Sequence, residues 1–262
     1  MDINLPGKTA IVCGSTQGIG KAVAIELANS GAAVTLLARN EKSLKQVLSE
    51  LNASKNQTHQ YVCADFANPE ELKSKIEEYV KSNPSVHILV NNTGGPPPGP
   101  IFDAELNMFA EGFSKHIICN QILVQALVPG MKTEKYGRII NIISTSVKQP
   151  IPGLGVSNTI RGAVASWAKT LAGELAPFGI TVNNVLPGYT YTQRLQSLIE
   201  TKASKSGKSI REVEEELLEV VPIGRFAEAR EIGYAVTFLA SEFSSFITGT
   251  SLPVDGGRIP SL

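Results

Sequence analysis

A glycine-rich turn near the N-terminus has the composition of a phosphate-binding segment. Gly14 to Gly20 reads Gly-Ser-Thr-Gln-Gly-Ile-Gly and lies between a short β-branched run and an apolar stretch with helical spacing. Backbone N–H groups at the positive end of a helix dipole suit a pyrophosphate. Lys21 is followed by Ala22, so no hydroxyl is placed for Mg²⁺ as in a P-loop. We therefore predict a nucleotide site whose contacts are Gly14, Ser15, Thr16, Gly18, Ile19 and Gly20.

The residues after the second and third predicted strands indicate which nucleotide binds. The second strand ends in Ala38-Arg39-Asn40 and carries no acid. A carboxylate there would bind the 2′-hydroxyl of NAD, whereas a cation accommodates the 2′-phosphate of NADP. We predict a preference for NADP(H), with Arg39 as phosphate partner and Ser15 and Thr16 as further contacts; a merely solvated Arg39 is the alternative. Asp65, after the third strand, is placed to bind an adenine amino group.

A second group of polar residues lies in the middle of the chain. Ser144 ends the fifth predicted strand, and Ser157 and Arg161 follow 13 and 17 residues later. A serine hydroxyl can hydrogen-bond a carbonyl oxygen. The guanidinium group of Arg161 could either hold the ribose of a nicotinamide nucleotide or meet a substrate carboxylate through its planar fork. Neither residue is a good proton donor at neutral pH. Two structural alternatives stay open, namely a helix N-cap at Ser157 and a strand-end hydroxyl cluster at Ser144.

Strands and helices alternate along most of the chain, as in a parallel sheet covered on both faces. The predicted strands are residues 9–13, 33–38, 59–64, 87–91, 138–144, 181–186 and 251–254. The predicted helices are residues 18–29, 41–52, 69–82, 103–132, 157–176 and 228–241. We therefore predict one α/β domain over residues 1–262, with a doubly wound parallel sheet of about seven strands. Ligands of such sheets bind beyond the carboxyl ends of the strands, where these motifs fall.

Two stretches depart from this alternation. The segment 94–100 contains three consecutive prolines, which lack backbone donors, so it is predicted to be a loop. Residues 189–226 are polar and charged, with one amphipathic helix expected over 209–220. An insertion at this place would overhang the crevice as a substrate lid. A solvated excursion without a role is the alternative.

The composition favours a small-molecule partner. The 262 residues include 24 basic and 24 acidic side chains, so no net charge favours nucleic acid or an anionic membrane. No run of eighteen apolar residues is present, and residues 1–8 carry an acid and a proline, so we do not expect export. The cysteines, Cys13, Cys63 and Cys119, lack metal-ligand spacing and are expected to be reduced core residues. We predict neither a metal site nor a membrane span.

Taken together, the ordered motifs resemble the short-chain dehydrogenase/reductase family over nearly the whole chain. The segments that carry the resemblance are residues 14–20, 91–94, 137–141, 187–192, 238–241 and 253–257, together with Asp65. The resemblance implies a Rossmann-type fold, NAD(P)(H), cytoplasmic residence, and a homodimer or homotetramer built on the helices at 103–132 and 157–176. It also implies that Pro187, Gly188, Thr190 and Thr192 bracket the nicotinamide carboxamide. Asn91 either faces the cofactor or ties strand ends together.

The active-site positions depart from the family pattern. By the resemblance, Ser144 is the usual serine, but Ser157 stands at the tyrosine position and Arg161 at the lysine position. The asparagine position holds His116, whose ordinary pKa lies near neutrality, so it is a candidate proton donor. Tyr189 and Tyr191 are the next candidates, since the resemblance puts them beside the nicotinamide.

Three functions are compatible with this sequence. The first is an NADP(H)-preferring oxidoreductase that interconverts a carbonyl and an alcohol with altered catalytic residues. The second is a cofactor-binding sensor or scaffold without redox turnover, which the missing tyrosine and lysine favour. The third is a lyase or isomerase on the same fold that uses His116 as acid or base. The hydroxyls of Ser144, Thr190 and Thr192 favour the first.

Overall fold

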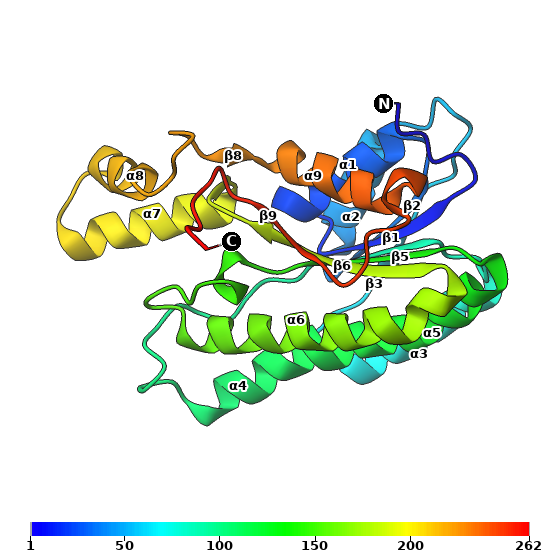
Figure 1. The fold of residues 1–262 in the computed structure, drawn as a ribbon, viewed down its shortest axis with the longest axis horizontal. Coiled ribbons are helices and arrows are strands. Elements are labelled where there is room, and N and C mark those ends of the chain that lie inside the picture. The colour runs from blue at the N-terminus through cyan, green and yellow to red at the C-terminus, as the bar shows by residue number, and fades with distance from the viewer. Residues whose placement is uncertain (1, 262) are drawn as a thin grey trace.

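The computed structural model describes residues 2–261. A sheet of seven parallel strands crosses the molecule, and helices pack against both faces (Figure 1). The strand order β3-β2-β1-β4-β5-β6-β9 confirms the predicted doubly wound α/β fold. The strands are β1 (Thr9–Cys13), β2 (Ala33–Ala38), β3 (Gln60–Cys63), β4 (Ile88–Asn91), β5 (Gly137–Ile142), β6 (Ile180–Pro187) and β9 (Ser251–Val254). A separate two-stranded sheet pairs β7 (Thr190–Tyr191) with β8 (Ala227–Glu228).

The helices form one layer on each side of the sheet. One layer consists of α1 (Gly18–Asn29), α2 (Glu41–Glu50) and α9 (Ala229–Ala240). The other consists of α3 (Pro69–Ser82), α5 (Cys119–Glu134) and α6 (Gly155–Leu175), with α4 (Leu106–Phe113) leading into α5. Short 3₁₀ turns cover Thr145–Val147, Ala176–Phe178 and Glu242–Ser244. Beyond β7, α7 (Gln193–Ser206) and α8 (Ile210–Leu218) extend from the end of the sheet (Figure 1).

The central strands are apolar on both faces, which explains their continuous hydrophobic runs. Successive side chains of a strand point to opposite faces of the sheet. Ile11 and Cys13 of β1 pack in the cluster beside α3, α5 and α6, whereas Ala10 and Val12 pack beside α1, α2 and α9. All four are fully buried. Of the other cysteines, Cys119 also lies in the core, and no disulfide joins any of them.

The element bounds agree with the sequence pattern at β1, β2, β9, α1 and α3, and differ mainly in two places. The predicted helix 103–132 is divided by a π-helical turn at Ser114–Ile118, between α4 and α5. The segment 189–226 contains α7 in addition to the expected helix α8. Thr192 caps α7, and Leu195, Ile199 and Ala203 form its buried face at a spacing of four residues. Within residues 2–261, no helix combines the length and apolar character that a membrane crossing requires.

Candidate active site

The glycine-rich turn joins β1 to α1 and depends on its glycines. Gly14 has a φ of +58° and Gly18 a φ of +53°, a left-handed backbone that side chains disfavour. The Nδ2 of Asn92 reaches over from the end of β4 and donates to the carbonyl oxygens of Cys13, at 3.2 Å, and Gly14, at 3.3 Å. A Cβ atom on Gly14 would lie 2.6 Å from the carbonyl oxygen of Asn92. One on Gly20 would collide with the carbonyl oxygen of Gly14.

The same turn has the features of a nucleotide site. Ser15 is fully buried, and its Oγ has no hydrogen-bond partner in the described part of the chain. Thr16, Gly18 and Ile19 are half-buried around the start of α1. The N-cap residue Gln17 makes no side-chain hydrogen bond to the helix. The start of α1 therefore lacks a side-chain cap, and its N–H groups and the Ser15 hydroxyl fit the phosphates of a dinucleotide.

Arg39 and Asp65 are neighbours at the carboxyl ends of β2 and β3. The Nη1 of Arg39 lies 4.0 Å from Oδ2 of Asp65, and the Arg39 side chain is 77% exposed. Oδ1 of Asp65 accepts a hydrogen bond from the backbone N–H of Ala67 at 2.9 Å. The guanidinium group is therefore largely open. Phosphate binding by Arg39 and adenine binding by Asp65 stay predictions.

A row of side-chain amides connects the strands beneath the site. The Nδ2 of Asn91 donates to Oδ1 of Asn141 at 2.9 Å, and the Nδ2 of Asn141 donates to Oδ1 of Asn184 at 3.0 Å. The Nδ2 of Asn184 donates to the hydroxyl of Ser251 at 3.1 Å. These hydrogen bonds link β4, β5, β6 and β9. They support the alternative in which Asn91 connects strand ends and does not face the cofactor. Oδ1 of Asn91 is buried and has no partner within residues 2–261.

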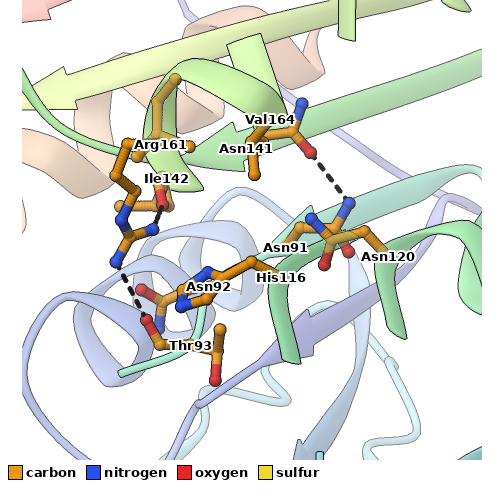
Figure 2. A pocket seen from close by; sticks show the side chains of 10 residues that line it. Asn91, Asn92, Thr93, His116, Asn120, Asn141, Ile142, Arg161 and Val164 are labelled. Atoms are coloured by element: carbon orange, nitrogen blue, oxygen red, sulfur yellow. Dashed lines mark hydrogen bonds between the residues drawn. The ribbon is translucent and has the colours of Figure 1, made fainter. Parts of the chain in front are cut away.

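Arg161 projects from α6 and is held rigidly by two carbonyl groups. Its Nη1 donates to the carbonyl oxygen of Ile142 at 3.0 Å, and its Nη2 donates to that of Thr93 at 3.3 Å (Figure 2). The residue is 8% exposed, and no carboxylate of residues 2–261 lies within 4.0 Å of its guanidinium. Burial and the charge of Arg194 lower the pKa of Arg161 to about 10, so the group stays protonated at neutral pH.

His116 occupies the π-helical turn Ser114–Ile118 and lines a small cavity beside Arg161 (Figure 2). It is 2% exposed, and its Nε2 lies 3.2 Å from the carbonyl oxygen of Gly94. Burial and the positive charge of Arg161 lower the pKa of His116 to about 3. The ring is therefore neutral at pH 7, which argues against an imidazolium proton donor. A neutral ring that donates from Nε2 to Gly94 satisfies both groups.

We expect His116 to make the free energy of unfolding depend on pH. The pKa of about 3 lies below the ordinary value of 6.5, so between these values the unfolded chain binds the extra proton. The contribution is complete above about pH 6.5 and falls as the pH decreases. One such group changes stability by at most about 1.4 kcal/mol per pH unit. His116→Gln should therefore lose less stability than the wild type between about pH 7 and about pH 5 in urea unfolding, and identical losses would contradict a buried neutral His116.

Ser144 and Ser157 differ in how their hydroxyls are used. Ser144 accepts a hydrogen bond from the N–H of Ser146 at 3.1 Å, and it caps a short 3₁₀ turn. Helix α6 begins at Gly155 with Leu154 as its N-cap, so the N-cap alternative for Ser157 is wrong. Ser157 is 8% exposed, and its hydroxyl makes no hydrogen bond within residues 2–261. It is thus an unpaired polar group in the first turn of α6.

The segment after β6 crosses over the glycine-rich turn. Pro187 ends β6, and Gly188 bends the chain closely past the segment after β9. Thr190 is buried and donates to the carbonyl oxygen of Gly188 at 3.2 Å, while Thr192 accepts at the start of α7. The methyl carbon of Thr192 lies 3.3 Å from the Cβ position on Gly18. Thr192 therefore lies beside the predicted pyrophosphate site, and the role of the four residues toward a nicotinamide stays a prediction.

The two candidate tyrosines lie in different environments. The hydroxyl of Tyr189 accepts a hydrogen bond from Nη2 of Arg258 at 3.3 Å, and its ring stacks edge-on against Phe226 at 6.2 Å between ring centres. Tyr191 is 53% exposed. Neither finding makes either residue a proton donor. The bond from Arg258 does, however, connect Tyr189 to the C-terminal segment.

Sequence reasoning missed four residues of this region, namely Gly95, Asn120, Arg194 and Arg258. Asn120 lines the same cavity as His116, which it follows by four residues on one helix face (Figure 2). The cavity leaves about 10 Å³ for the centre of a water molecule, which is room for about one water. Gly95 lies near Arg161 and Arg194, and Arg258 contacts Thr145. The helical spacing could have indicated Asn120, but the other contacts join distant segments.

The fold and this site define a nucleotide-binding protein of the Rossmann type, and known proteins identify the family. A family model described as "Enoyl-(Acyl carrier protein) reductase" matches residues 14–258. The chain is 28% identical to the NADPH-dependent reductase BacG of Bacillus subtilis, over 97% of this chain and 99% of that one. It is 32% identical to the 3-oxoacyl-[acyl-carrier-protein] reductase FabG of Haemophilus influenzae, over 97% and 98%.

A solved structure shows the same likeness in three dimensions. The L-sorbose reductase of Gluconobacter frateurii, complexed with NADPH and L-sorbose, superposes with a TM-score of 0.94. It is 30% identical to this chain, and the match covers 100% of both chains. The chain therefore belongs to the short-chain dehydrogenase/reductase family. It is an oxidoreductase of that family, as its resemblance predicted.

Proposed function

We propose that this protein is an NADP(H)-dependent oxidoreductase that interconverts a carbonyl group and an alcohol on a small molecule. The observation that carries the proposal is the buried, protonated guanidinium of Arg161 beside the unpaired hydroxyl of Ser157. A fixed positive charge and a free hydroxyl suit an oxygen on which negative charge develops. Both lie at the carboxyl end of the sheet, as does the glycine-rich turn.

The cofactor assignment rests on the turn and on the end of β2. The L-sorbose reductase binds NADPH and BacG is NADPH-dependent by their own descriptions, which supports NADP(H) over NAD(H) here. Gly14, Gly18 and Gly20 would hold the pyrophosphate at α1, and Arg39 would bind the 2′-phosphate. A bound nicotinamide supplies one chemical step, the transfer of a hydride to or from the carbonyl carbon.

The remaining chemistry falls to the altered residues. Ser144 and Ser157 would donate hydrogen bonds to the carbonyl oxygen, and Arg161 would stabilise its negative charge. The guanidinium keeps its proton, since its pKa of about 10 lies well above neutrality. In the direction of reduction, the proton that completes the alcohol would come from solvent water. In this scheme, electrostatic stabilisation by Arg161 takes the place of proton donation by the tyrosine that the family usually has.

The segment 189–226 would act as a lid over this site. Its helices α7 and α8 share a small apolar cluster of their own, which includes Leu195, Ile199, Val213 and Leu217. Thr192, at its start, lies against Gly18 of the cofactor turn. A segment with its own core can move as a unit while Thr192 remains near the cofactor.

Arg39→Asp should reverse the cofactor preference. The substitution removes the proposed partner of the 2′-phosphate and puts a carboxylate at the end of β2, where it would bind a ribose hydroxyl. We expect the affinity for NADPH to fall by roughly 10- to 100-fold, with tighter binding of NADH. Titrations followed by nicotinamide fluorescence measure both constants. Unchanged affinity for NADPH would show that Arg39 is a solvated surface residue.

We also propose a homo-oligomer built on α4, α5 and α6. An open apolar groove there is lined by Phe109, Phe113, Ile118 and Ile160. Phe113 is 45% exposed and Ile118 is 42% exposed. Both apolar side chains would pack against a second copy of the chain.

The double variant Phe113→Glu, Ile118→Glu should convert that oligomer to a monomer. Two carboxylates facing their copies across a symmetric interface would repel each other and lose apolar contact area. Light scattering coupled to size-exclusion chromatography gives the mass of each form. A wild-type monomer, or an unchanged mass in the double variant, would contradict this interface.

A further inference from the structure

The arginines without a carboxylate partner gather at the candidate active site. The sequence contains eight arginines. Within residues 2–261, the five that have a carboxylate oxygen within 4.0 Å are Arg39, Arg138, Arg211, Arg225 and Arg230. The other three are Arg161, Arg194 and Arg258. Arg161 donates to backbone carbonyls, and Arg258 donates to Thr145 and Tyr189.

Two of these arginines converge on Gly95 from different helices. The Nη2 of Arg161 lies 3.2 Å from the Cβ position on Gly95, and the Nη2 of Arg194 lies 3.3 Å from it. The hydroxyl of Ser157 lies 3.6 Å from the same point. Because Gly95 has no side chain, no Cβ atom separates the two guanidinium groups and the hydroxyl, so all three can face one ligand. Arg161 and Ser157 come from α6 and Arg194 from the first turn of α7, so the lid segment supplies one of the three groups.

Neither of these two guanidinium groups has a carboxylate partner within the described residues, and their like charges repel each other. The charge of Arg194 lowers the pKa of both Arg161 and His116, in the direction expected of a nearby cation. Arg161 is buried, and a buried charge is ordinarily paired because its desolvation is costly, whereas Arg194 is exposed to solvent at the edge of the site. No acidic residue of the described chain provides the counter-charge here. An anion from outside the chain would neutralise the pair and complete the hydrogen bonds of both forks.

We propose that Arg194 binds a carboxylate group of the substrate beside Arg161, whose guanidinium also faces the reacting carbonyl oxygen. The substrate is therefore a carbonyl compound that carries a carboxylate near its reacting carbon. This inference rests on the proposed function and names its substrate class. A carboxylate is planar and offers two oxygens, which the arginine fork matches. The Ser157 hydroxyl, which lies beside the two guanidinium groups, would then donate a hydrogen bond to the adjacent ketone oxygen. A 2-oxo acid has this spacing, because its ketone carbon is bonded directly to the carboxylate carbon.

A matched pair of substrates tests the carboxylate contact. Benzoylformate and its methyl ester present the same ketone, but only the acid is charged. The ratio of kcat/KM for the acid to kcat/KM for the ester should fall by roughly 10- to 100-fold in Arg194→Gln, the range for a lost charge-assisted hydrogen bond. Arg211→Gln, in the same lid but paired with Glu215, is the control and should keep the wild-type ratio. An unchanged ratio in Arg194→Gln overturns the inference.

A binding measurement covers the case in which turnover is absent. Calorimetry on the NADPH-loaded protein should show binding of oxamate and none of its neutral analogue oxamide. Binding of oxamate should be lost in Arg194→Gln and in Gly95→Ala, which keeps both charges but fills the shared point. Equal binding of oxamate in Gly95→Ala and the wild type overturns the inference.

A third arm separates the substrate from the cofactor as the source of the anion. The Kd of NADPH should be the same in Arg194→Gln and the wild type. A Kd that rises by the same factor as the acid-to-ester ratio falls would assign Arg194 to a cofactor phosphate and overturn the inference. Failure of the wild type to bind NADPH at all would instead refute the proposed function, whereas oxamate binding to the protein without cofactor would still support the carboxylate site.

Discussion

Arg161→Met should lower kcat/KM for carbonyl reduction by roughly 100- to 1,000-fold, the usual cost of removing one group that stabilises an oxyanion. The guanidinium is the only buried cation beside the unpaired Ser157 hydroxyl in the described residues, and two carbonyl groups fix its position. Methionine fills similar space without charge or donors. Initial rates of NADPH oxidation with a carbonyl substrate measure the effect.

Two further variants show whether the charge itself is responsible. Arg161→Lys keeps the charge and should recover part of the lost activity. Arg138→Met removes another buried arginine, which is paired with Glu242 at the opposite end of β5. It should lower stability but leave kcat/KM of the folded protein unchanged. If Arg161→Met kept full activity and lost only affinity for NADPH, Arg161 would bind the nicotinamide ribose and not the reacting oxygen.

Gly20→Ala should abolish NADPH binding and destabilise the fold by about 1–3 kcal/mol, as an extra methyl group does in a closely packed place. The new Cβ would collide with the carbonyl oxygen of Gly14 and lie 2.6 Å from Nδ2 of Asn92. The turn would have to open, and the hydrogen bonds from Asn92 would break. Urea unfolding and nicotinamide fluorescence measure the two effects.

Gly173→Ala is the matched control for that substitution. Gly173 lies on the exposed side of α6, and a Cβ there meets no atom within 4 Å. Alanine should therefore leave NADPH binding unchanged and slightly stabilise the helix. If Gly20→Ala bound NADPH as well as Gly173→Ala does, the turn would not be the pyrophosphate site.

The fold could be predicted from sequence because its strands and turns have local signatures. The strand β1 is apolar on both faces, and Gly14 to Gly20 follows it directly, so strand, turn and helix are recognised within one short segment. The π-helical turn at His116 could not be predicted, because apolar spacing does not distinguish it from the α-helix on either side. Helix α7 was missed because its polar residues conceal a narrow apolar face.

The sequence singled out Ser157 and Arg161, but not Arg194 or the electrostatics of the candidate site. Ser157 and Arg161 were singled out because the resemblance puts them at the tyrosine and lysine positions, whereas the convergence of Arg161 and Arg194 at Gly95 joins three separate segments. The N-cap alternative for Ser157 was wrong because α6 starts at Gly155, earlier than its polar residues indicated. His116 was considered a proton donor because of its ordinary pKa, but burial and Arg161 lower that pKa to about 3.

The most direct test of the proposed function is isotope transfer from NADPH that carries deuterium at the reactive nicotinamide position. The purified protein would be incubated with this cofactor and a panel of ketones and 2-oxo acids, and the products analysed by mass spectrometry. We predict an alcohol that carries one deuterium at the former carbonyl carbon and is lost in Arg161→Met. Tight NADPH binding with no deuterated product from any carbonyl compound would contradict the account and identify a cofactor-binding protein without redox turnover.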